Sequence, residues 1–212
     1  MSDYYNNIKE YIDTNLIDTI SLYIDDTKYL EDVKKQTYNN IRDIYKNLNN
    51  SNNNLVNTSH DFCIQSIVDQ YFDVVILNIK NYNLRTNKLK HLLELKFPEQ
   101  HSQEWFDVRK TVITASSLAS VLGACHYKSR DELLLEKIEN VQAPYEFNPI
   151  TEWGVKYEEI ATKFYESINN IKIREFGMIP HPKFPIFGAS PDGICDYGSF
   201  ELTGRMLEIK CP

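Results

Sequence analysis

The sequence predicts an α/β protein in which a core, made of a small central sheet flanked by helices, follows an all-helical N-terminal region. Through residues 1–95, apolar side chains recur every three or four positions, as they do along one face of a helix. Pro98 marks a boundary, and beyond it helical patterns are followed by short apolar runs that are typical of strands. We therefore expect a helical region at 1–97, with no assigned role, and the α/β core at 98–212.

Four stretches of helical spacing fill the N-terminal region. They cover residues 8–16, 30–48, 62–75 and 89–95, and an Asn-rich loop at 49–54 separates the second stretch from the third. No catalytic pattern accompanies these stretches. We therefore expect three or four packed helices that cap the core or form a separate module.

The core should contain four helices and three short strands. Thr114 and Thr151 are good N-cap residues, and Gly123 is suited to end the short helix that begins after Thr114. The expected helices cover 104–109, a short segment reaching Val121, 130–138 and 151–168, and the expected strands cover 171–173, 187–189 and 205–210.

Composition excludes several classes of protein. The 212 residues are 42% apolar and 25% charged, which is ordinary for a globular protein in water. No run approaches the roughly 18 apolar residues of a membrane span, and the polar, acidic start is not a secretory signal. The four cysteines form no C-x-x-C pair, which argues against zinc and predicts a reduced, intracellular compartment.

The net charge of −7 argues against a protein that simply coats nucleic acid, because such a protein would be basic. The same charge suits an enzyme that concentrates acidic side chains at a metal site. Such an enzyme would hold the nucleic-acid backbone with a few local cations, so the overall charge constrains association rather than chemistry.

An acidic motif near the end of the chain is the most informative feature. Asp192 lies in a Ser-Pro-Asp-Gly turn, and Glu208 and Lys210 are two residues apart in an apolar run. Residues two apart in a strand share a face, so Glu208 and Lys210 should both point toward Asp192. Two carboxylates suit Mg²⁺, and a neighbouring lysine can orient or deprotonate water, which together serve phosphodiester hydrolysis. Taken singly, a Glu-x-Lys strand and a Pro-Asp-Gly turn are also common without any function.

Glu158 is a further acidic candidate. It lies in the expected helix at 151–168, close to the side that carries Val155, Ile160, Ala161 and Phe164, which we expect to face inward. A carboxylate on an inward face is costly unless it is paired or bound to a metal. The alternative is that Glu158 lies at the rim of this face and pairs with a nearby lysine.

Arg109 and Ser116 are candidates for binding phosphate. Arg109 ends a helix just before a Thr-x-x-Thr-Ala-Ser turn, where an arginine close to the N–H groups of a helix start can clamp a phosphate. Ser116 could add a hydroxyl. The alternative is a surface arginine beside an ordinary capped helix. We expect Trp105 and Trp153 in the core, and Cys125 in a structural loop.

Four motifs occur in a fixed order in the second half of the chain. They are Arg-x-x-x-Ile-Thr-Ala-Ser at 109–116, Gly-x-x-x-Glu-x-x-Ala at 154–161, Ser-Pro-Asp-Gly at 190–193 and Leu-Glu-Ile-Lys-Cys-Pro at 207–212. Together they resemble the phage-lambda-type exonucleases, or YqaJ-like viral recombinases, of the PD-(D/E)XK nuclease superfamily. The resemblance covers about residues 102–212 and implies a restriction-endonuclease-like fold.

The resemblance implies roles for the acidic motifs. Asp192, Glu208 and the Ile209 carbonyl would bind Mg²⁺, for which Mn²⁺ can substitute. Lys210 matches the catalytic lysine of the family, and Glu158 matches the helical acid that supports metal binding.

The resemblance also implies a substrate and partners. Arg109, Ser116 and Ser190 match positions that hold the terminal 5′-phosphate or the adjacent backbone. Family members digest one strand of duplex DNA from its 5′ end. Several cooperate with a strand-annealing protein in recombination, and some form ring-shaped trimers.

One departure from the family concerns the end of the chain. The sequence stops at Pro212, whereas family members continue with a helix and further strands whose Tyr/Gln-type pattern helps to complete the site. We therefore expect a fragment, a truncated gene product or an inactive remnant. Two alternatives to an exonuclease stay open, namely a structure-specific or restriction-type endonuclease and a non-catalytic DNA-binding or assembly protein.

Overall fold

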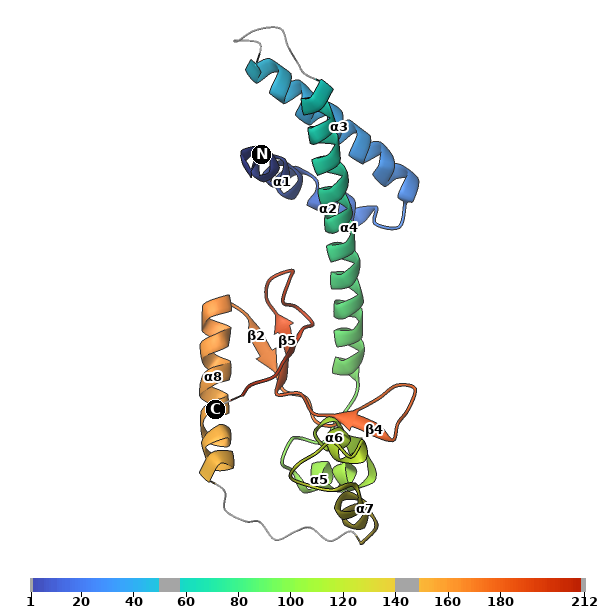
Figure 1. Cartoon of the computed structure of the whole chain (residues 1–212), viewed down its shortest axis with the longest axis vertical. Helices are drawn as coiled ribbons and strands as arrows, with labels where there is room; N and C mark the ends of the chain where they lie inside the picture. The colour runs from blue at the N-terminus through green and yellow to red at the C-terminus, as the bar shows by residue number, and fades with distance from the viewer. Residues whose placement is uncertain (1, 50–57, 140–148, 211–212) are drawn as a thin grey trace. The chain divides into compact units, whose positions relative to one another are not determined.

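The computed structural model describes residues 2–49, 58–139 and 149–210. The chain divides into two compact units, Met1–Leu84 and Arg85–Pro212, and the division falls within one long helix (Figure 1). The first unit is helical and the second combines helices with short strands, so the predicted α/β class with a helical N-terminal region is confirmed.

The described residues of the first unit form four helices. They are α1 (Ser2–Asn15), α2 (Ile17–Leu22), α3 (Thr27–Asn49) and α4 (Thr58–Glu94), the last of which continues into the second unit. The apolar positions that predicted helices form its core, with Ile8, Ile12, Ile20, Val68 and Phe72 almost fully buried. The Asn-rich segment lies largely outside the described residues.

The third and fourth helical stretches of the sequence belong to a single helix. Residues 76–88 contain neither glycine nor proline, so nothing interrupts α4 between them. Its segment Asp61–Glu94 is long and apolar enough, by length and composition alone, to cross a membrane. A buried core helix meets the same criterion, and Val68 and Phe72 of this segment are fully buried in the first unit.

The helices of the second unit follow the predicted order. Beyond the end of α4 they are α5 (Gln103–Thr111), the 3₁₀ turn η1 (Ala115–Ser117), α6 (Leu118–Val121), α7 (Arg130–Glu139) and α8 (Pro149–Asn169). Gly123 follows α6 with a φ of +70°, in the left-handed region that suits a helix end. The α8 helix begins two residues before Thr151, and the Thr151 side chain lies outside the described residues.

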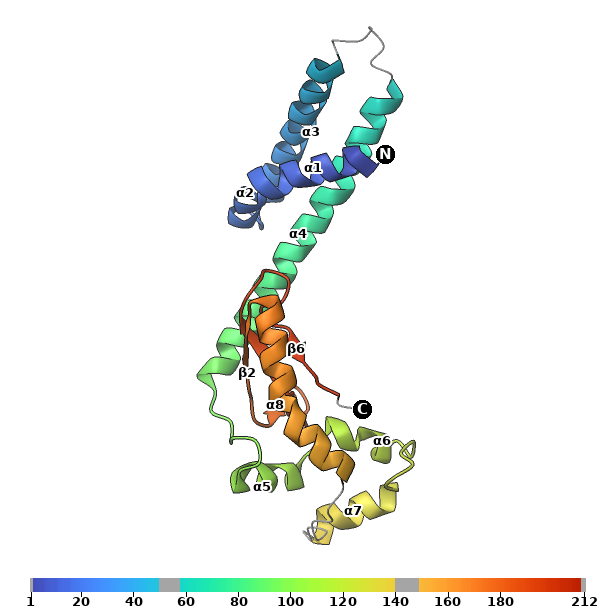
Figure 2. The same cartoon turned by 90° about the vertical axis from the view of Figure 1, so that its left-hand side faces the viewer.

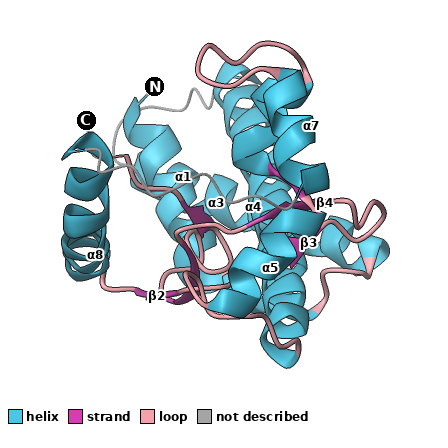
Figure 3. Cartoon of the chain, turned by 90° about the horizontal axis from the view of Figure 1, so that it is seen from below, coloured by secondary structure: helices cyan, strands magenta, loops and turns pink. Residues whose placement is uncertain are grey.

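The strands form two small sheets rather than one (Figure 3). In the first, β4 (Phe187–Ala189) lies between β1 (Ile113–Thr114), to which it is parallel, and β3 (Ile179–Pro180), to which it is antiparallel. In the second, β5 (Gly193–Tyr197) lies between β2 (Lys172–Arg174) and β6 (Met206–Leu207), and both pairs are antiparallel. Sequence patterns indicated β2, β4 and β6 but missed β1, β3 and β5.

The predicted strand at 205–210 is much shorter in the structure. β6 ends at Leu207, because the next N–H that could continue the pairing, that of Ile209, donates instead to the Asp192 carboxylate. Glu208, Ile209 and Lys210 therefore continue the chain beyond the sheet as an irregular segment.

The predicted inward face of α8 is wrong. Val155, Ile160 and Phe164 are 59%, 58% and 67% exposed. The half-buried stripe instead includes Glu158 and Tyr165, on a helix that packs beside β2 (Figures 1 and 2). The hydrophobic periodicity correctly indicated a helix, but the face that contacts the sheet is the one that carries a carboxylate.

Gly204, in the turn between β5 and β6, should tolerate substitution worse than Gly123, because only Gly204 is crowded. Both have a positive φ, but a Cβ on Gly204 would lie 3.1 Å from the Arg85 backbone, whereas one on Gly123 would meet nothing within 4 Å. We expect Gly123→Ala to cost about 1 kcal/mol and Gly204→Ala about 2–4 kcal/mol of unfolding free energy. Chemical denaturation followed by circular dichroism measures both, and equal losses would show that the contact with Arg85 has no weight.

Candidate functional site

The register of β5 and β6 places the acidic motifs side by side. Gly193 pairs with Leu207. Asp192, immediately before β5, and Glu208, immediately after β6, are therefore neighbours on adjacent antiparallel strand ends. The Ile209 N–H donates to Asp192 Oδ2 at 2.5 Å, and the Lys210 ammonium pairs with the Glu208 carboxylate. The sequence-predicted neighbours therefore lie together at one end of the second sheet.

Glu158 of α8 belongs to the same group of charges. Burial raises the pKa of the Glu158 carboxyl, and the negative charge of Asp192 raises it further, with smaller contributions from Glu175 and Glu208. The pKa of Lys210 is raised chiefly by its hydrogen bond with Glu208 and also by the charges of Asp192 and Glu158. The four residues that the sequence singled out as catalytic therefore share one electrostatic environment.

The donor chemistry of this acidic cluster, defined as Glu158, Asp192 and Glu208, suits a hard divalent cation. All three side chains offer carboxylate oxygens, and the pKa of Glu158 is raised first by burial and then by repulsion from Asp192, which a cation would relieve. Within the described residues, no three His, Cys, Asp or Glu side chains already stand in a metal-binding arrangement. Asp192 and Glu208 instead accept hydrogen bonds from Ile209 and Lys210.

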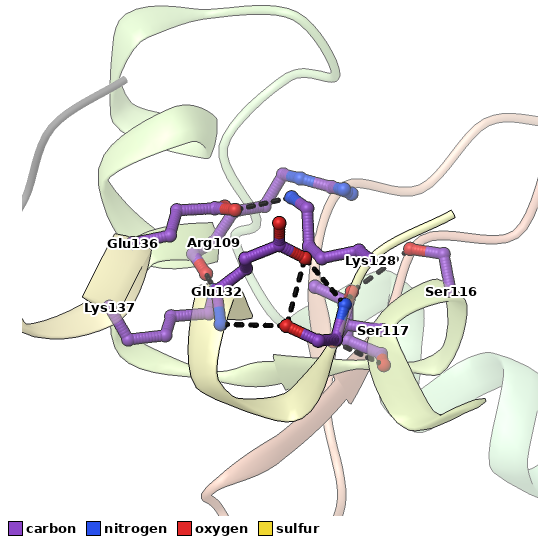
Figure 4. Close-up of polar contacts among 9 residues, drawn as sticks. Arg109, Ser116, Ser117, Lys128, Glu132, Glu136 and Lys137 are labelled. Carbon is purple, nitrogen blue, oxygen red and sulfur yellow. Dashed lines mark hydrogen bonds and ion pairs between the residues drawn. The ribbon is translucent and has the colours of Figure 1, made fainter. Parts of the chain in front are cut away.

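A basic pocket of about 540 Å³ lies in the same unit, between α5, the turn at η1, the loop after α6 and α7. The predicted phosphate ligands Arg109 and Ser116 both line it (Figure 4). Its other polar lining residues are Lys110, Thr114, Ser117, Ser120, Cys125, Tyr127, Lys128, Glu136 and Lys137. Cations, hydroxyls and a volume that admits a phosphate group make this basic pocket a candidate anion site.

Two lysines of the basic pocket have definite partners. The Lys128 ammonium forms an ion pair with the Glu136 carboxylate, and the Lys137 ammonium donates to the Arg109 carbonyl oxygen at 2.5 Å (Figure 4). Burial lowers the pKa of both Arg109 and Lys137, and the Glu136 charge partly offsets the shift in each. Positive charge is therefore concentrated where water solvates it incompletely.

Trp105 connects the basic pocket to the Ser-Pro-Asp-Gly turn. Its indole N–H donates to Ser190 Oγ at 2.9 Å, and the Arg109 guanidinium lies over its ring, 4.4 Å from the centroid. The predicted phosphate ligands Arg109 and Ser190 thus contact the same side chain. Trp105 is 6% exposed, as expected of a core residue, but Trp153 is 52% exposed and lies against Tyr157, so its core assignment was wrong.

The predicted cap at Thr114 takes a different form. Its side chain makes no capping bond to the backbone, and its Oγ1 instead hydrogen-bonds the hydroxyls of Ser116 and Ser117 at 2.9 and 3.0 Å. The 3₁₀ geometry that follows Thr114 accounts for the difference, since the tighter turn brings the hydroxyls together. The side chain therefore orders the pocket wall rather than a helix terminus.

Sequence reasoning missed the contribution of α7 to the basic pocket. It predicted a helix at 130–138 but gave Glu136 and Lys137 no role. The sequence did contain an indication of this role. Lys137 lies four residues after Leu133, so the two side chains share a face of the helix, and Leu133 is buried. A lysine on a buried face is costly unless its ammonium is hydrogen-bonded or paired.

The second unit is thus an α/β domain that carries a cluster of carboxylates with a lysine, together with a basic pocket large enough to admit a phosphate group. Residues 104–212 match the sequence profile of the YqaJ-like viral recombinase domain. The chain belongs to this family, which confirms the resemblance carried by the four motifs and places the chain in the PD-(D/E)XK superfamily.

Viral proteins are among the curated relatives. "Uncharacterized protein R354" of Acanthamoeba polyphaga mimivirus is 35% identical over 137 residues, which cover 62% of this chain and 25% of the relative. "Protein D345L" of African swine fever virus is 31% identical over 120 residues, which cover 53% of this chain and 33% of the relative. The chain therefore spans a quarter to a third of the length of these relatives.

Among solved structures, the alkaline exonuclease LHK-Exo of Laribacter hongkongensis is 31% identical in the matched region. The match covers 44% of this chain and 48% of that one, with a TM-score of 0.38.

Trp105 should contribute to stability through its bond to Ser190. In Trp105→Phe the hydroxyl of Ser190 loses its indole donor and the core loses volume, so we expect the free energy of unfolding to fall by about 1–3 kcal/mol. The matched control is Trp153→Phe, where the ring is exposed and the change should stay within about 0.5 kcal/mol. Denaturant titration followed by circular dichroism compares the two, and equal stabilities would contradict the structural role of Trp105.

Proposed function

We propose that this chain is the nuclease core of a metal-dependent DNA exonuclease, which digests duplex DNA from an end during recombination, repair or viral genome processing. The observation that carries the proposal is the acidic cluster with Lys210, held within one unit that also contains a basic pocket large enough to admit a phosphate group. Membership of the YqaJ-like family supports the same reading.

The acidic cluster would hold Mg²⁺ or Mn²⁺. Asp192, Glu208 and the Ile209 carbonyl would supply oxygen ligands, and Glu158 would stand behind them, where its raised pKa already reflects the two neighbouring carboxylates. The bound cation would polarise the scissile phosphate and lower the pKa of bound water.

Lys210 would position the attacking water and offset negative charge that develops at the phosphate. In this structure its ammonium forms an ion pair with Glu208, which places it beside the acidic cluster. Because the Lys210 side chain is largely exposed, it could turn toward a bound substrate. Arg109, Ser116 and Ser190 would receive the terminal 5′-phosphate or the adjacent backbone, with Arg109 held in place by the Trp105 ring.

The partners of this activity are part of the same proposal. Ends of double-stranded DNA are the proposed substrate, in an intracellular setting. A ring-shaped trimer and cooperation with a strand-annealing protein are proposed from the family resemblance.

A comparison of linear and closed-circular duplex DNA tests the reaction class. We expect Mg²⁺-dependent loss of the linear duplex and survival of the circle, because an exonuclease needs an end. Lys210→Ala should slow cleavage of the linear duplex by about 10²-fold or more while DNA binding persists, since the lysine acts in the transition state. Gel analysis over time measures both rates. Cleavage of the circle would instead establish an endonuclease, and DNA binding without cleavage by the parent protein would favour the non-catalytic alternative.

Recognition of the strand end is tested at Arg109. If its guanidinium binds a 5′-phosphate, Arg109→Ala should lose about 1.5–3 kcal/mol of binding to phosphorylated ends and little to hydroxyl ends. Fluorescence anisotropy with the two duplexes, in EDTA to prevent cleavage, gives both affinities. Equal losses for both ends would mean that Arg109 serves structure rather than phosphate recognition.

A further inference from the structure

The charges that line the basic pocket are unequally balanced. Lys110 pairs with Asp107 at 3.0 Å, and Lys128 pairs with Glu136. Arg109 and Lys137 have no carboxylate within ion-pair distance among the residues that the structure describes. Among the described residues that line the basic pocket, Glu136 is the single acidic side chain.

The cations of the basic pocket repel one another. The pKa of Lys137 is lowered by burial first, and the charges of Arg109 and Lys128 lower it further, whereas Glu136 raises it. Removing the negative charge of Glu136 would therefore leave three neighbouring cations without compensation. Within the described lining, Glu136 is the carboxylate that offsets these cations.

The ion pair between Lys128 and Glu136 is exposed enough for either side chain to change partner. The two side chains are 45% and 40% exposed, and an ion pair so open to water adds little stability. Arg109, by contrast, is fixed over the Trp105 ring, and Lys137 is tied to the Arg109 carbonyl. Lys128 is thus the cation of this pocket that can most readily change partner.

We propose that Glu136 sets the affinity of the basic pocket for phosphate, by neutralising Lys128 when the pocket is empty and giving it up when a phosphate group enters. This role rests on the proposed function, because it assigns a competitor to the same anion site. Any phosphate that binds must displace the carboxylate from Lys128, and the carboxylate can reclaim Lys128 when the phosphate leaves.

A double-mutant cycle on the full chain tests the proposal. Binding of duplex DNA with 5′-phosphate or 5′-hydroxyl ends is measured in EDTA for the parent, E136Q, K128M and the double variant. We expect E136Q to bind phosphorylated ends about two- to fivefold more tightly, the range for freeing one partly exposed charge. K128M should bind them more weakly by a similar factor, and E136Q should bring little gain in the K128M background, because Glu136 acts on phosphate by occupying Lys128; the two effects are therefore non-additive.

The matched control is E104Q, which removes the same charge from the exposed first turn of α5 without lining the basic pocket. It should leave the preference for phosphorylated ends unchanged. If the parent shows that preference but E136Q behaves like E104Q, the role of Glu136 is overturned while the proposed function stands. If E136Q weakens binding as K128M does, the pair is a structural clamp of α7, and if E136Q gains as much in the K128M background as in the parent, Glu136 does not act through Lys128; either result likewise overturns the role.

A second probe separates this inference from the proposed function. Thermal unfolding with inorganic pyrophosphate needs no DNA and no metal, and E136Q should gain more stabilisation from pyrophosphate than the parent or E104Q. That gain in a protein whose parent form ignores DNA ends would support the role of Glu136 and contradict end recognition. No difference among the three proteins would contradict the competition itself.

Discussion

The indole of Trp105 is the contact on which the arrangement of the candidate site depends. Through its N–H it holds Ser190, two residues before Asp192, and through its ring face it supports Arg109. One buried side chain therefore links the Ser-Pro-Asp-Gly turn, which carries Asp192 of the acidic cluster, to Arg109, which lines the basic pocket. A ring can serve both purposes because its edge donates a hydrogen bond while its face attracts a cation.

The two sheets complete this arrangement by backbone pairing. In the first sheet β1 and β4 are parallel, so the residues that follow them, Ser116 and Ser190, leave the sheet at the same edge. In the second, the antiparallel register of β5 and β6 places Glu208 beside Asp192. The chain crosses from one sheet to the other within the Ser-Pro-Asp-Gly turn. Very short strands are sufficient here, because a few fixed residues at each strand end are all that the site requires.

Motif spacing selected side chains that lie close together in the structure, but it predicted the elements around them less well. Asp192, Glu208, Lys210 and Glu158 were found from carboxylates and a lysine at particular spacings, and the structure brings them into one electrostatic environment. The inward face of α8 was missed because periodicity locates an apolar stripe but not the surface that covers it. Strands of two residues, such as β1, are too short to show any alternation.

Charges of opposite sign are separated within the second unit, so a protein with a net charge of −7 can carry both an acidic cluster and a basic pocket. Carboxylates gather at the end of the second sheet, where burial and mutual repulsion raise the pKa of Glu158. Cations gather around α5 and α7, where burial lowers the pKa of Arg109 and Lys137. Each cluster is destabilising alone, so the fold must supply the opposing energy through buried contacts such as Trp105 and Leu133. A net charge averages over such opposing clusters, so it does not show where each sign gathers on the molecule.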